Sequence, residues 1–170
     1  IGYQMGYRKI KVKSDEMKAL LKERDRLGTE LTKSVKAMYE VKKLGDLASL
    51  KEKYKATEIL VIQTGYMDQK IMAGGYYDDP LKGDIQDFLC VDAMVNTKYG
   101  TQFMNDLKRK ASTVKTPEEF EVVVTEFKVV LADIQKQYAG LKPKSEEMKP
   151  LVAQIDKAMG DMSASMDELV

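Results

Sequence analysis

Apolar residues recur every three or four positions in five stretches of the chain, which is the spacing of one face of an α-helix. The last stretch is the most regular. Its apolar residues are separated by four, four, three, four and three positions: Leu151, Ile155, Met159, Met162, Met166 and Leu169. Charged residues such as Lys157 and Asp161 fall between them. The pattern predicts an amphipathic helix that begins near Pro150.

Three earlier stretches are bounded by helix start and stop signals. The first begins at Ser14, which can cap a helix, and runs about 30 residues to Gly45, a residue type common at helix ends. The second covers residues 46–73, and we expect its apolar residues to face the core: Leu47, Leu50, Tyr54, Leu60, Val61, Met67 and Ile71. The third covers residues 84–107, and the segment 96–100 allows it to kink or split.

The clearest local signal is the tetrapeptide Thr-Pro-Glu-Glu at residues 116–119. Threonine at the cap, proline at the first helical position and glutamate three residues after the cap form a capping box. The residues that follow are rich in valine, which favours strands. The capping box and the length of the stretch nevertheless predict a helix that ends at Gly140.

Glycine occurs at four positions inside these predicted helices. A glycine there costs about 1 kcal/mol relative to alanine, so we expect each one to allow either close packing or a kink. The four residues are Gly28, Gly65, Gly100 and Gly160.

These patterns predict an all-α protein: an elongated up-and-down bundle or coiled coil of four to five helices, with short connections and one longer loop near residues 74–83. Residues 14–170 are interpreted as a single helical-bundle domain. Residues 1–13 are interpreted as a separate basic N-terminal arm, because Tyr7 to Lys13 alternates basic and apolar residues with the period of a strand rather than of a helix.

Composition removes several classes of function. The 170 residues include no histidine and no tryptophan, so the commonest general acid–base group and metal ligand is missing. The single cysteine, Cys90, cannot form an internal disulfide or a cysteine-based zinc site. No phosphate-binding glycine loop or nucleophile elbow occurs. We predict a protein that is not an enzyme and has no cofactor.

Charge is distributed unevenly along the chain although the net charge is only +1. Residues 1–55 hold 15 Lys and Arg against 8 Asp and Glu, whereas the remainder holds 13 against 19. Such a chain can pair its own halves, associate head to tail or meet a charged surface. Nucleic acid is not the expected partner, because no recognised binding motif is present.

Two groups of side chains are candidate partner-binding residues. The basic arm can contact phosphates or an anionic lipid surface, and two tyrosines in the 74–83 loop can anchor a protein partner. A solvated terminus and tyrosine rings folded back on the bundle explain the same residues. The candidates are Arg8, Lys9, Lys11, Lys13, Tyr76 and Tyr77.

Three carboxylates in the same region, Asp78, Asp79 and Asp84, are a weak calcium candidate. Their spacing is not that of an EF-hand loop. A solvated turn followed by a helix cap explains them equally well, so we predict no metal.

The sequence leaves two functional classes. The first is a non-enzymatic structural or interaction subunit of a larger assembly, which binds a protein partner or itself through helix–helix contacts. The alternative is an extracytoplasmic ligand-binding input domain of a membrane sensor, of the chemoreceptor or sensor-kinase type. An up-and-down bundle of five helices favours the assembly subunit, whereas four would return both termini to one end. Membrane proximity would come from segments outside this chain, and an extracytoplasmic or cell-envelope location is favoured.

Overall fold

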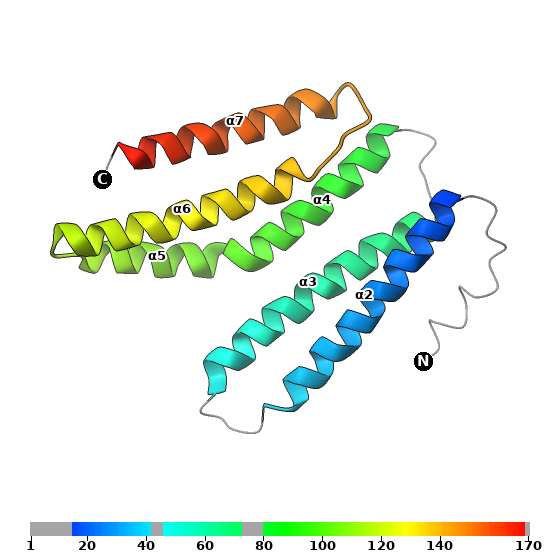
Figure 1. The fold of residues 1–170 in the computed structure, drawn as a ribbon, viewed down its shortest axis with the longest axis horizontal. Coiled ribbons are helices and arrows are strands. Elements are labelled where there is room, and N and C mark those ends of the chain that lie inside the picture. Colours follow the sequence, from blue (N-terminus) through cyan, green and yellow to red (C-terminus); the bar gives the residue numbers. More distant parts are fainter. Residues whose placement is uncertain (1–14, 42–45, 73–79, 169–170) are drawn as a thin grey trace. The chain divides into compact units, whose positions relative to one another are not determined.

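The all-α class is confirmed by the computed structural model, which describes residues 15–41, 46–72 and 80–168 (Figure 1). These ranges contain six α-helices and no strand. The chain divides into two compact units, residues 1–78 and 79–170, each of which is described below by itself. The expectation of a single bundle domain over residues 14–170 remains a prediction.

The first unit contains α2 (Asp15–Tyr39) and α3 (Leu47–Met72), which pack side by side as an antiparallel pair (Figure 1). Met17, Leu27 and Ile71 are its buried apolar residues. We expected the first helix to reach Gly45, but α2 ends at Tyr39. Its last turn tightens, because the Val41 N–H bonds to the carbonyl three residues back rather than four.

Polar side chains join α2 to α3 along the interface between the two helices. The Arg24 guanidinium donates two hydrogen bonds to the Asp68 carboxylate, at 2.8 and 3.3 Å, and both side chains are mostly covered. The Ser34 and Thr57 hydroxyl oxygens are 2.7 Å apart. The two-point ion pair and the hydroxyl contact together set the register of α2 against α3.

The second unit contains α4 (Pro80–Tyr99), α5 (Thr101–Thr113), α6 (Pro117–Ala139) and α7 (Met148–Asp167). Figure 1 shows α6 between α7 on one side and α4 with α5 on the other, and α6 contacts all three. The buried apolar residues of this unit lie mainly on α6: Leu107, Val124, Val130, Leu131, Tyr138 and Met148.

In the second unit, one predicted helix boundary is corrected and one open alternative is decided. We expected residues 80–83 to belong to a loop, but α4 begins at Pro80, because proline suits a first helical turn that needs no N–H donor. The predicted helix over 84–107 splits at Gly100, where an extended backbone separates α4 from α5. The described residues therefore contain six helices rather than four to five.

The predicted capping box begins α6. The Thr116 side chain accepts a hydrogen bond from the Glu119 N–H at 3.2 Å. The Glu119 carboxylate accepts at 2.7 Å from the N–H of Lys115 rather than from that of Thr116. The helix ends at Ala139, before Gly140, as expected.

Candidate functional site

A buried carboxylate joins the start of α4 to the connection between α6 and α7. Asp84 accepts hydrogen bonds from the Lys144 N–H at 2.9 and 3.1 Å. It also accepts from the Ser145 N–H at 2.7 Å and the Ser145 hydroxyl at 2.6 Å. Both residues that face each other here, Asp84 and Ser145, are buried.

These donors explain the ionisation of Asp84. Burial by itself raises the pKa of this carboxyl, but the hydrogen bonds from Ser145 and Lys144 outweigh it, so the pKa lies below the usual value. The carboxylate oxygens are used to hold the α6–α7 connection. Asp84 therefore acts as a structural link, and its calcium-candidate neighbours Asp78 and Asp79 lie outside the described residues.

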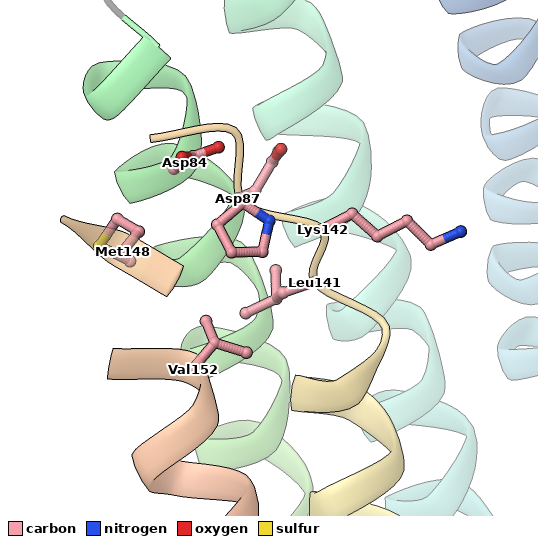
Figure 2. Close-up of a pocket in the computed structure, with 7 residues that line it drawn as sticks. Asp84, Asp87, Leu141, Lys142, Met148 and Val152 are labelled. Atoms are coloured by element: carbon pink, nitrogen blue, oxygen red, sulfur yellow. The ribbon is translucent and has the colours of Figure 1, made fainter. Parts of the chain in front are cut away.

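A small hollow borders this link (Figure 2). Its volume is about 210 Å³ with open solvent included. Figure 2 shows residues from α4, from α7 and from the connection around it. The lining residues are Asp84, Asp87, Leu141, Lys142, Pro143, Met148 and Val152. Within the described ranges, no three acidic, cysteine or histidine side chains are placed to hold a metal ion.

Polar contacts hold α6 against α4. Asp133 accepts hydrogen bonds from the Tyr99 hydroxyl at 2.6 Å and the Lys98 ammonium at 2.8 Å. The hydrogen bond from Lys98, followed by that from Tyr99, lowers the pKa of the Asp133 carboxyl. The Tyr138 hydroxyl donates to Asp92 at 3.0 Å, and burial together with this carboxylate raises the pKa of Tyr138 to about 12.

Further pairs occupy both flanks of α6. On the α5 side, the Lys110 ammonium lies 2.7 Å from both carboxylate oxygens of Glu126. On the α7 side, Gln135 donates to Asp156 at 2.9 Å, and Lys128 pairs with Asp167 at 2.6 Å. The contacts with α4, α5 and α7 thus leave one face of α6 turned away from the unit.

That face of α6 is the first of two exposed surfaces with helical spacing. Its six residues are all exposed and are separated by four, three, four, three and four positions. Val122 and Val129 are 66% and 65% exposed. We call this surface the α6 seam: Glu118, Val122, Thr125, Val129, Ala132 and Lys136.

The second surface lies on α3. Leu47, Tyr54 and Val61 are 56%, 56% and 53% exposed, and Met72 is 81% exposed. At about 100° per residue, the four positions fall within roughly 40° of one another around the helix. Between them lies Gly65, and nothing lies within 4 Å of the place where its Cβ would be. We call these five residues the α3 stripe.

These surfaces correct several expectations. Leu47, Tyr54 and Val61 were expected to face the core, but they are exposed because α2 covers a neighbouring face of α3 instead. Close packing at Gly65 and Gly160 is also wrong, since neither has an atom near its Cβ position. The seven-residue spacing of the α3 stripe was the signal available in the sequence.

The candidate partner-binding residues predicted from the sequence lie outside the described residues. Arg8, Lys9, Lys11 and Lys13 precede the described ranges, and Tyr76 and Tyr77 fall between two of them. None of the described helices combines the length and apolar content needed to cross a membrane.

Comparisons of the chain with protein-family models, curated proteins and solved structures find no match.

Proposed function

We propose that this protein is a non-enzymatic structural or interaction subunit of a larger assembly and acts through helix–helix contacts. The α3 stripe carries the proposal. Four large apolar side chains, each more than half exposed, follow one face of a 26-residue helix. Apolar side chains that recur at seven-residue spacing on one exposed helix face, as Leu47, Tyr54 and Val61 do, are typical of a helix that packs against a partner helix.

The shape of the α3 stripe suits a helix as the partner. The stripe extends from Leu47 to Met72, over about 38 Å at 1.5 Å per residue. Gly65 has no side chain, so a partner backbone can approach α3 closely there. The proposed partner is another protein or a second copy of the chain. Neither a nucleic acid nor a cofactor is proposed. An extracytoplasmic or cell-envelope location remains part of the proposal.

The test is the mass of the full chain in solution, measured by light scattering at several concentrations and two salt levels. We expect association that grows with concentration. The double variant Tyr54→Ser and Val61→Ser should weaken it at least about 10-fold, because two exposed apolar contacts are lost. Ala56→Ser, exposed on the opposite side of the same helix, should leave it unchanged.

A salt-insensitive monomer at every concentration contradicts the proposal and favours the alternative, the extracytoplasmic input domain of a membrane sensor. Association that the α3 variants leave unchanged shows that the α3 stripe is not the contact.

A further inference from the structure

The α6 seam has the spacing of a helix that packs against another helix. Its residues alternate steps of four and three, as do the contact positions of a coiled coil. Valines occupy one set of positions, at 122 and 129, and the smaller Thr125 and Ala132 occupy the other. An acidic residue, Glu118, precedes them and a basic residue, Lys136, follows them.

The seam is complementary to itself when a second copy runs in the opposite direction. A two-fold axis at residue 127 places Val122 opposite Ala132 and Val129 opposite Thr125, so that each large side chain faces a smaller one. The same register places Glu118 of each copy opposite Lys136 of the other. Coiled coils that run antiparallel pair the two sets of contact positions in this way.

A parallel arrangement lacks both kinds of complementarity. Glu118 would then face Glu118 and Lys136 would face Lys136, which places like charges together at each end. Each valine would also face a valine and Ala132 would face Ala132. The two helices would then be held apart at the valines and would leave space at the alanines. The charges at the two ends therefore favour a partner that runs antiparallel to α6.

The rest of α6 leaves the seam available for a partner. Two acidic groups beside the seam are paired within the chain, Glu126 with Lys110 and Asp133 with Lys98. They therefore add less repulsion between two copies than free carboxylates would. The helices α7 and α4 with α5 cover the flanks of α6 and not the seam.

We propose that the α6 seam binds the α6 seam of a second copy of this chain in an antiparallel, two-fold symmetric pair. The inference rests on the proposed function and names one of its partners. The contact is isologous, so each substitution acts twice in the dimer. The seam spans about 27 Å from Glu118 to Lys136, and its small apolar area predicts a weak dimer.

Charge exchange at the ends of the seam tests the antiparallel register in the full chain. Glu118→Lys alone and Lys136→Glu alone each replace two attractive pairs by two repulsive ones, and each should weaken the dimer about 10-fold at low salt. The double variant restores both pairs and should regain the affinity of the original chain. Sedimentation equilibrium measures the dissociation constants.

Mixing the two single variants gives the sharpest comparison. A chain with lysine at both ends and a chain with glutamate at both ends each repel their own copies, but the two are complementary to each other. We expect the mixture to associate about 10-fold more tightly than either variant alone. Recovery of binding on mixing also shows that both variants are folded, and circular dichroism provides an independent check.

Two further variants separate the seam from general effects of charge. Val129→Asp places a carboxylate inside the seam and should weaken the dimer at least about 30-fold. Lys108→Glu, at an exposed position of α5 outside the seam, changes the net charge as much as Lys136→Glu does. It should leave association unchanged.

The outcomes distinguish this inference from the proposed function. Association that the α3 variants weaken, but that the seam variants and their mixture leave unchanged, overturns the α6 pair and supports the assembly function. Single variants that bind as well as the original chain overturn the antiparallel register. A monomer at every concentration overturns both.

Discussion

At the residue scale, Asp84 links the start of α4 to the connection between α6 and α7. Its carboxylate is buried and accepts hydrogen bonds from two residues 60 and 61 positions later in the chain. A buried carboxylate is stable only when such donors replace water. The link therefore depends on Asp84 being ionised.

We expect Asp84→Asn to lower the free energy of unfolding by about 1–3 kcal/mol, because the amide replaces a charged acceptor by a neutral one. Urea denaturation followed by circular dichroism measures the change. Asp106→Asn is the matched control, since Asp106 pairs with Arg109 on the exposed surface and should cost less than about 0.5 kcal/mol.

We also expect the effect of Asp84→Asn on the free energy of unfolding to depend on pH. The folded-state pKa of Asp84 is depressed below the value of 3.8 for a free carboxyl. Its stabilisation is therefore present above that value and is lost as pH falls through the folded-state pKa. The difference in unfolding free energy between the original chain and Asp84→Asn should be constant near neutral pH and shrink below 3.8. A difference that persists unchanged at the lowest pH would contradict the role of the charge.

At the element scale, glycines in similar sequence contexts differ in what surrounds them. At Gly100, a Cβ atom would lie 2.3 Å from the carbonyl oxygen of Asn96, whereas at Gly65 it would meet nothing within 4 Å. The first glycine permits the break between α4 and α5. The second costs α3 helix stability without a packing reason inside the described structure.

We therefore expect opposite effects from one substitution. Gly100→Ala should destabilise the chain by about 1–3 kcal/mol, because a backbone oxygen must move. Gly65→Ala should stabilise it by about 0.4–1 kcal/mol through helix propensity. Thermal unfolding of both variants checks the signs. If a partner approaches α3 closely at Gly65, this variant should associate more weakly although it is more stable.

At the scale of the whole molecule, each unit has its own buried residues. Leu27 and Ile71 are buried in the first unit, and Val124 and Leu131 are buried in the second. The two exposed surfaces are divided in the same way, with the α3 stripe in one unit and the α6 seam in the other. An assembly subunit with two such surfaces can contact two partners.

Hydrogen exchange in the full chain tests the division into units. Leu131→Ala removes a side chain that is 3% exposed and should cost about 2–5 kcal/mol. We expect faster exchange in α4 to α7 and little change in α2 and α3. Leu27→Ala, equally buried in the first unit, should show the reverse. Equal acceleration in both units after either substitution would contradict this.

The sequence by itself determined the all-α class and both ends of α6. The periodicity, the capping box at Thr116 and the end at Gly140 predicted α6 almost to the residue, because helix bonds and caps form between residues at most a few positions apart. The sequence allowed either a kink or a split in segment 96–100, and the structure decided for a split at Gly100. The start of α4 at Pro80 was missed, because proline indicates a loop and a first helical turn equally well.

Only the tertiary structure decided which apolar residues are covered and what Asp84 does. Tyr54 and Val61 fit a helical stripe as well as Ile71 does, yet Ile71 is buried and the other two are exposed. The hydrogen-bond donors for Asp84 come from the connection that follows α6, and no pattern in the sequence near Asp84 predicts them. Burial and long-range hydrogen bonds depend on which helices pack together, whereas the formation of each helix depends on its own residues.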